Sequence, residues 1–187
     1  MVKNKRYMKE KIILAAMKVF SRYGFFRAPV HLIAKEAGVS KGLIFWYFKN
    51  KQELIMEVAK RSLPLEIIDS CLELGLSGRE ILECIGRGYI RRYENATQRN
   101  LLLHTMALES LYEEVAKEIN YLCEKKLDEI AKRAFGELST KGRIAVRAFF
   151  GGLMCYILRR PRDIDEETYL ENLIDMVLTH QKRIDET

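Results

Sequence analysis

PVHLIAKEAGVSKGLIFWYF, residues 29–48, predicts two short helices joined by a tight turn. Pro29 suits the first position of a helix, where its missing N–H would have no partner. Gly38 follows the last apolar residue of that helix, where a left-handed residue ends a helix easily, and Ser40 can cap the next helix with its hydroxyl. The first helix has one apolar face, formed by Val30, Ile33, Ala34 and Ala37.

The second of these helices is expected to have a buried face and an exposed face. The buried face contains Ile44 and either Tyr47 or Phe48, whereas Lys41, Gly42, Phe45 and Trp46 point outward. Two helices joined by a short turn that contains Gly form a helix-turn-helix unit, whose second helix enters the major groove of DNA. The stretch therefore predicts a DNA-binding unit.

The distribution of charge supports this interpretation. The 187-residue chain has a net charge of +6, but residues 1–61 alone contain 14 Lys or Arg and only 4 Asp or Glu. The rest of the chain carries a net charge of −4. A basic N-terminal third that coincides with a helix-turn-helix unit indicates a surface for phosphates rather than an ordinary solvated face.

Helical patterns continue on both sides of the helix-turn-helix unit. Residues 7–23 predict a helix that Gly24 ends, and the basic residues 1–6 are expected to form a mobile arm. Asn50 is expected to cap the helix after the unit, with the Glu53 carboxylate reaching back to the N–H of Asn50. The helical pattern continues to residue 184, so the sequence predicts an all-α fold of about nine helices. The buried stripe of the first helix is expected to contain Met8, Ile12, Ala16, Val19, Phe20 and Tyr23.

The four cysteines show no CxxC pair and no Cys/His spacing typical of a metal site. Cys71, Cys84, Cys123 and Cys155 each lie in an apolar helical pattern. We therefore expect buried free thiols in a reducing compartment, without a disulfide framework, a metal or a cofactor. The N-terminus does not resemble a signal peptide, and the longest apolar run, residues 148–158, is shorter than the roughly 20 residues that span a bilayer. These features predict a cytoplasmic protein with no membrane partner.

The spacing of residues in and around the helix-turn-helix unit resembles the signature of the TetR family of transcriptional regulators. The resemblance covers about residues 8–55. It implies a DNA-binding domain at residues 1–50, with the helix-turn-helix at 29–48, and a helical ligand-binding and dimerisation domain at residues 51–187. It further implies a homodimeric repressor that a small apolar ligand releases from a palindromic double-stranded operator. The residues that carry the resemblance are Ile12, Ala15-Ala16, Phe20, Gly24-Phe25, Ile33-Ala34, residues 37–42, Tyr47-Phe48, Lys51 and Glu53-Leu54.

Seven residues are candidates for contact with DNA. Lys41 can reach a phosphate or a guanine edge, and Gly42 lets the helix approach the groove closely. Tyr47 and Lys51 match family positions that contact the phosphate backbone, and such contacts fix the register of the protein on DNA. The other candidates are Leu43, Phe45 and Trp46.

The chain departs from the family pattern in three places, each of which removes a hydroxyl group. Family members often have Thr at Ala28 or Pro29 and at Leu43, and Tyr at Phe45. Either Leu43 and Phe45 extend the core, or these two residues and Trp46 contact thymine methyl groups. If these residues contact thymine methyl groups, the operator is expected to contain thymines at the contacted positions.

A ligand pocket and a dimer interface are expected in the second domain. The candidates for an apolar pocket with a few polar groups are Tyr89, Tyr93, His104, Tyr112, Phe149, Phe150 and Met154. Each of them also suits ordinary core packing, but buried tyrosine hydroxyls need partners. The resemblance implies that the last two long helices form the dimer interface, for which the candidates are Phe149, Gly152, Leu173 and Val177.

Two other classes of function are alternatives to a regulator that responds to a ligand. An enzyme is disfavoured because the chain contains no HExxH, GxSxG, phosphate-loop, CxxC or Glu-x-x-His motif. The second alternative is an architectural helix-turn-helix protein that binds DNA without responding to a ligand. Its core domain would have no cavity.

Overall fold

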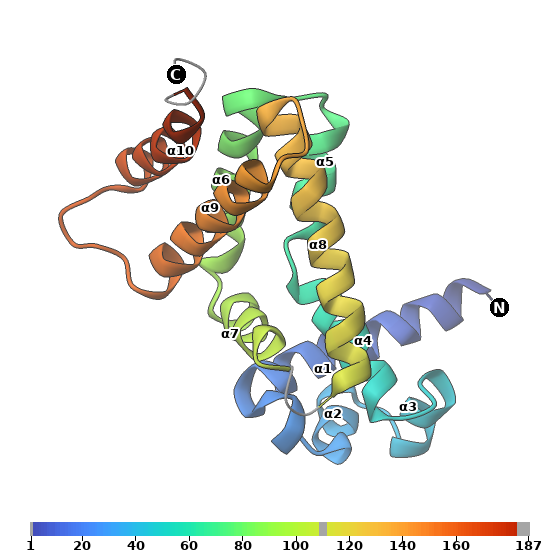
Figure 1. Ribbon diagram of the computed structural model, residues 1–187. Helices are drawn as coiled ribbons and strands as arrows, with labels where there is room; N and C mark the ends of the chain where they lie inside the picture. Colours follow the sequence, from blue (N-terminus) through green and yellow to red (C-terminus); the bar gives the residue numbers. More distant parts are fainter. Residues whose placement is uncertain (1, 109–111, 183–187) are drawn as a thin grey trace. The chain divides into compact units, whose positions relative to one another are not determined.

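The computed structural model describes residues 2–108 and 112–182, and this part of the chain is all helical (Figure 1). No described helix is long and apolar enough to cross a membrane. The described residues form ten helices, where the sequence predicted about nine, and the predicted last residue, 184, lies outside them. The helices are α1 (Val2–Arg27), α2 (Val30–Ala37), α3 (Lys41–Tyr47), α4 (Lys51–Ser62), α5 (Leu65–Glu73), α6 (Gly78–Tyr93), α7 (Ala96–Met106), α8 (Glu113–Phe135), α9 (Thr140–Leu158) and α10 (Glu166–Lys182).

The helices form two compact units, each with contributions from two parts of the chain. The first unit comprises residues 1–63 and 95–120, and the second comprises residues 64–94 and 121–187. In the first unit α1 packs against α2, α4 and α7, and α2 packs against α3. The units differ from the predicted domains because α4 and α7 pack on α1. The functional boundary between residues 50 and 51 stays a prediction.

The turn and caps of the helix-turn-helix follow the prediction, except that Pro29 is the N-cap of α2, in an extended conformation, rather than its first helical residue. Gly38 ends α2 in the left-handed region, with φ 61° and ψ 41°, and the Ser40 hydroxyl accepts a hydrogen bond of 3.1 Å from the N–H of Leu43. Asn50 caps α4 by accepting from the N–H of Glu53 at 2.9 Å. The Glu53 carboxylate accepts from the N–H of Lys49 rather than from that of Asn50. These caps fix both ends of α3 relative to α2 and α4.

Helix α1 differs from its prediction at both ends. It begins at Val2, so the residues expected to form a mobile arm are helical except Met1, which lies outside the described residues. It continues past Gly24, which has φ 73° and ψ 166° and interrupts the helix, to Arg27. This interruption changes the direction of the side chains after it. Tyr23, which comes directly before it and was expected to be buried, is 51% exposed.

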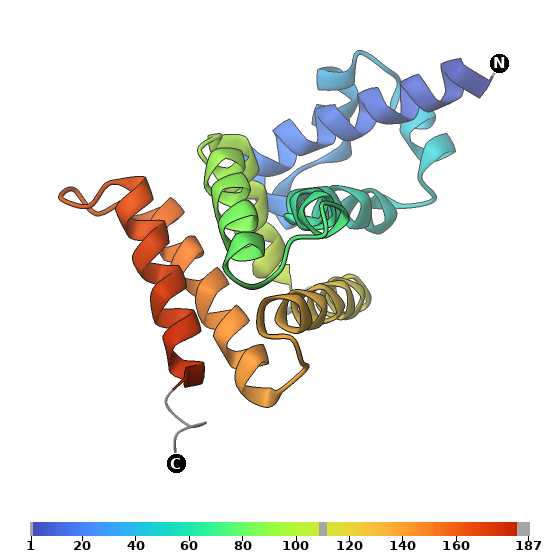
Figure 2. The ribbon, with the colours of Figure 1, turned by 90° about the horizontal axis from the view of Figure 1, so that it is seen from above.

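In the second unit α6 packs against α5, α9 and α10, and α9 lies beside α10 (Figure 2). The contact between α9 and α10 is close at Gly152, where a Cβ atom would lie 2.6 Å from Cδ1 of Leu173. The Tyr169 hydroxyl donates to the carbonyl oxygen of Gly152 at 2.9 Å. Gly152 therefore serves packing within this chain.

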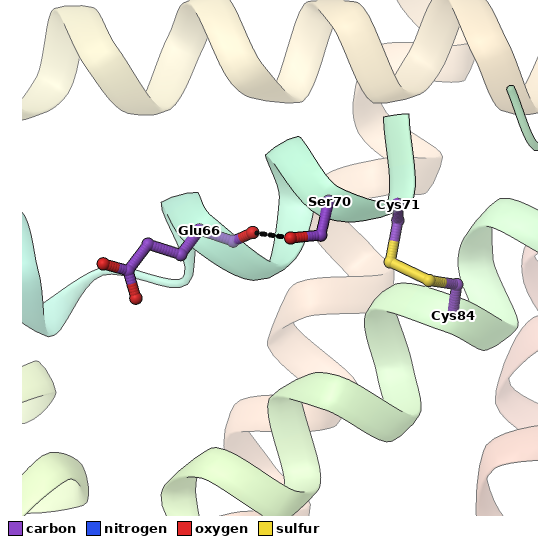
Figure 3. Close-up of a disulfide and its surroundings, with 4 residues drawn as sticks. All are labelled: Glu66, Ser70, Cys71 and Cys84. Carbon is purple, nitrogen blue, oxygen red and sulfur yellow. Dashed lines mark hydrogen bonds between the residues drawn. A yellow bond between two sulfur atoms is a disulfide. The ribbon is translucent and has the colours of Figure 1, made fainter. Parts of the chain in front are cut away.

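A disulfide between Cys71 of α5 and Cys84 of α6 corrects the expectation of four free thiols (Figure 3). The two residues are 13 positions apart in the sequence, but the α5–α6 hairpin brings their Cα atoms to 6.0 Å, within the range for a disulfide. Of the two free cysteines, Cys123 is half-buried and Cys155 is exposed. Sequence spacing alone could not reveal the pair because it depends on how α5 packs against α6.

Removal of this disulfide is expected to lower the unfolding temperature. A link that closes a loop of this size contributes about 3 kcal/mol, chiefly by restricting the unfolded chain, which corresponds to roughly 6–12 °C for a chain of this length. The measurement is thermal unfolding of wild type and Cys84→Ala, with Ser70→Ala, an exposed position of α5, as the control. Two titratable thiols are expected in the denatured, unreduced wild type. Four thiols, or equal unfolding temperatures for Cys84→Ala and wild type, would contradict the prediction.

Candidate nucleic-acid interface

Helix α3 presents a face of large side chains to solvent. Ile44 and Phe48 are buried, with 1% and 0% exposure, whereas Trp46 is 62% exposed and Phe45 is 40% exposed. This division was predicted, and Phe48 rather than Tyr47 is the second buried residue. The remaining candidates on α3 divide as follows: Lys41 and Gly42 are exposed, and Leu43 and Tyr47 are half-buried. Phe45 and Trp46 are therefore available for contact with a partner, while Leu43 contributes in part to the core.

The exposed rings of this face are held by neighbouring side chains. The Trp46 and Tyr47 rings meet edge to face, with centroids 4.7 Å apart and an interplanar angle of 86°. The Lys5 ammonium lies 4.6 Å from the centroid of the Trp46 ring, and the Lys41 ammonium lies 5.8 Å from that of Phe45. Cation–π contacts of this kind place two positive charges beside the aromatic face.

Lys5 is a member of this surface that sequence reasoning missed. The basic character of residues 1–6 was the available signal. Because these residues were expected to form a mobile arm, no fixed position was predicted for Lys5. The first turns of α1 place Lys5 over Trp46. Neither Lys5 nor Lys41 forms a salt bridge with a carboxylate of the described residues. Their charges are available to DNA phosphates.

Lys51 has a partner within the chain. Its ammonium donates to the carbonyl oxygen of Phe26 at 2.9 Å, near the end of α1, and burial lowers the pKa of the Lys51 amine. A cation at the C-terminal end of a helix also interacts favourably with the helix dipole. Lys51 thus ties the end of α1 to the start of α4, directly after the α3 segment.

The pocket candidates lie in different units. In the second unit Tyr89 and Tyr93 are 2% and 0% exposed, and their ring centroids lie 4.5 Å apart. The Tyr89 ring lies 5.9 Å from that of Phe150, and its hydroxyl donates to Met154 Sδ at 3.9 Å. Burial raises the pKa of both tyrosines, so both hydroxyls stay protonated at neutral pH. These residues form a packed aromatic cluster, together with Phe149.

His104 and Tyr112 lie in the first unit, where they line a cavity of about 450 Å³. The rest of its lining consists of residues 23–27, Ala107 and Leu108. Gly24 lies against the His104 imidazole, since a Cβ at this glycine would be 3.5 Å from His104 Cε1. The sequence assigned His104 and Tyr112 to one pocket with the tyrosines of α6, whereas in the structure they belong to the first unit and the tyrosines of α6 to the second.

Three of the four dimer candidates are buried inside the chain. Phe149, Leu173 and Val177 are 0%, 8% and 7% exposed, and Gly152 contacts Leu173. They hold α9 against α10, so an Asp at one of the three would first disturb folding. A different face of α9 is exposed, and it contains Ile144, Ala148, Gly151, Cys155 and Leu158. We call it the α9 stripe.

Comparison with known proteins identifies relatives of both the N-terminal part and the whole chain. Residues 12–58 match the family described as "Bacterial regulatory proteins, tetR family". The chain is 39% identical over 62 residues to the fatty acid metabolism regulator protein of Bacillus subtilis (strain 168), a match that covers 33% of this chain and 32% of that one. The match with this chain therefore spans about a third of the length of that relative. It is 27% identical over 191 residues to the HTH-type transcriptional regulator AcrR of Shigella flexneri, covering 91% of this chain and 89% of that one.

The fold is also found in solved structures. The crystal structure of AibR in complex with isovaleryl coenzyme A and operator DNA aligns with a TM-score of 0.69 and 17% identity, over 91% of this chain and 98% of that chain. A helix-turn-helix with an exposed second helix, in a stretch that matches this family, is the arrangement of a DNA-binding unit. Over residues 12–58 the chain matches the TetR family, and its fold is similar to that of AibR.

Proposed function

We propose that this protein is a homodimeric repressor that acts in the cytoplasm and binds a palindromic operator. The observation that carries the proposal is the outward face of α3, where Phe45 and Trp46 are exposed beside Lys41 and Lys5. An apolar and basic helix face of this kind suits the major groove, where bases present acceptor atoms and thymine methyl groups. A repressor of this type blocks transcription by occupying its operator.

Each α3 would read one half-site. Lys41, in the first turn, contacts a guanine edge or a phosphate, and Gly42 permits close approach. Phe45 and Trp46 contact thymine methyl groups and sugars, and Tyr47 contacts a phosphate. Lys51 holds the end of α1 through Phe26, and this role supplements or replaces the phosphate contact that the family resemblance implied.

A second copy of the chain would cover the α9 stripe. Its five residues follow one another at intervals of four and three positions, so they lie on one face of α9. None is charged, and Ile144 is 62% exposed. Apolar residues at this spacing form the seam between paired helices. The stripe replaces Phe149, Leu173 and Val177 as the proposed contact surface.

We further propose that a small ligand releases the operator. AibR, which shares the fold, has a structure in complex with isovaleryl coenzyme A and operator DNA, so this fold can accommodate a small ligand, and the first unit of this chain contains a cavity. The second candidate function, an architectural protein without a ligand, would have no use for this cavity.

Selection of duplexes from a random pool tests the proposed function. Purified protein is expected to retain a palindrome with half-sites about 34 Å apart, one turn of the duplex, with thymines beside the contacted positions. Undiminished affinity for a half-site without thymines would contradict the thymine contacts. Recovery of no motif, together with binding that disappears as salt rises, would leave only electrostatic attachment and favour the architectural alternative.

Lys41→Ala is expected to weaken operator binding by about tenfold, since one base contact contributes roughly 1–3 kcal/mol. The measurement is a fluorescence-anisotropy titration of the selected operator at fixed salt. Lys125→Ala, an exposed lysine of α8, is the matched control and should bind like the wild type. Equal affinity for Lys41→Ala and wild type would exclude a contact from Lys41 to the operator.

A further inference from the structure

The cavity in the first unit lies beside the interruption of α1. Gly24 redirects the chain, and after it Phe25 points into the core at 4% exposure while Phe26 is 65% exposed. Tyr23, directly before Gly24, is 51% exposed. His104, in the last turn of α7, and Ala107, directly after this helix, also line the cavity. The volume of about 450 Å³ is within the range of small-molecule sites, roughly 300–1,000 Å³.

The lining of the cavity combines apolar side chains with a few polar groups that can donate hydrogen bonds to an anion. Phe25, Phe26, Ala107 and Leu108 supply the apolar surface. The polar groups are the Arg27 guanidinium, the His104 imidazole and two tyrosine hydroxyls, and no carboxylate is among the described residues that line the cavity. Among the described residues, no Asp or Glu forms a salt bridge with Arg27. An anion with an apolar tail complements this lining, whereas a cation would be repelled by the positive charge of Arg27.

We propose that this cavity is an effector site for an apolar carboxylate, such as a medium-chain fatty acid or an aromatic acid. Its carboxylate pairs with Arg27 and His104, and its tail lies against Phe25 and Leu108. The site lies inside the DNA-reading unit rather than in the aromatic cluster of α6 and α9. This inference rests on the proposed function, because an effector site needs an operator to release.

The position of the cavity couples it to the reading helix. Residues 23–27 form one wall, and within this segment the carbonyl oxygen of Phe26 accepts the hydrogen bond from Lys51. Lys51 is the first residue of α4 and follows Asn50, which caps α4 directly after α3. A ligand that displaces residues 23–27 therefore moves the start of α4 and, with it, the end of α3. The DNA-reading face changes without a signal from the second unit.

Calorimetric titration of the full chain without DNA tests the site, with octanoate as the probe and octylamine and octanol as matched compounds. Octanoate is expected to bind once per chain and octylamine at least tenfold more weakly. Arg27→Gln is expected to reduce octanoate affinity about tenfold, the effect of losing one charge-assisted hydrogen bond. Arg22→Gln, an exposed arginine of α1 outside the lining, is the matched control and should bind octanoate normally. Ala107→Phe fills the cavity and should abolish binding.

Two further measurements test whether ligand binding in the cavity changes the DNA-reading helix α3. Trp46 is the single tryptophan, so its fluorescence should change when octanoate binds to the wild type but not to Ala107→Phe. Octanoate should also weaken operator binding by the wild type while leaving that of Ala107→Phe unchanged.

The results separate the site from the proposed function. Absence of octanoate binding, or equal binding by wild type, Arg27→Gln and Ala107→Phe, would overturn the proposed site even if the protein selects a palindrome. Failure to select any operator would instead overturn the proposed function, and the titration without DNA would still decide whether the cavity binds carboxylates.

Discussion

Gly151→Asp is expected to convert the protein to a monomer that binds its operator at least about 100-fold more weakly, because the second half-site contact becomes a separate binding event. Gly151 is exposed in the middle of the α9 stripe, and a Cβ atom there would meet no heavy atom within 4 Å. The substitution therefore leaves the chain's own packing intact. In a dimer it places an unpaired charge from each copy in an apolar interface, and a buried charge without a partner costs about 3–5 kcal/mol.

Light scattering and operator titration measure the two parts of this prediction. Ser70→Asp, an exposed position on α5, introduces the same charge and should remain dimeric. The unfolding of each Asp variant should be followed alongside, so that loss of the dimer is distinguished from loss of the fold. A folded Gly151→Asp variant that stays dimeric would exclude the α9 stripe as the interface. A monomeric wild type would exclude the dimer itself.

Phe149→Ala is expected to lower the free energy of unfolding by about 3–5 kcal/mol, the typical cost of truncating a buried phenylalanine. The Phe149 side chain is 0% exposed and its ring centroid lies 5.7 Å from that of Phe150. The loss combines the transfer free energy of the ring with the cost of the cavity that remains. From the sequence, Phe149 was a candidate for ligand binding and for dimerisation. Its burial instead predicts an effect on the free energy of unfolding.

Denaturant unfolding at a fixed protomer concentration measures this effect, because the stability of a dimer depends on concentration. Tyr121→Ala is the control: Tyr121 is 67% exposed on α8, and truncation at the surface should change the free energy by no more than about 0.5 kcal/mol. A Phe149→Ala variant as stable as the Tyr121→Ala control would show that the Phe149 ring is not part of the core.

The helix-turn-helix could be predicted in detail because its signals are local. Gly38 and Ser40 act on backbone groups within four residues, so their effect is written in the sequence around them. The same holds for Asn50 at the start of α4. The exposed face of α3 follows from helical periodicity once Ile44 is assigned to the core. Lys5 could not be placed in this way, since its contact with Trp46 joins two helices far apart in the chain.

The expected pocket and dimer surfaces were less well predicted because aromatic and apolar residues look alike in a sequence. Tyr89 and Tyr93 pack as a buried cluster, whereas His104 and Tyr112 line a cavity in the other unit. Periodicity shows that α9 has apolar residues on more than one face. It does not show that Phe149 packs inside while Gly151 faces outward.

The sequence by itself determined the all-helical class, the helix-turn-helix and the basic character of the DNA-reading part, since these depend on local caps, turns and composition. Tertiary structure alone decided the Cys71–Cys84 disulfide, the free face of α9, and the cavity between Gly24 and His104. Each of these requires two segments, or the two faces of one helix, to be placed in space. Such placement depends on long-range packing, which no short pattern of residues encodes.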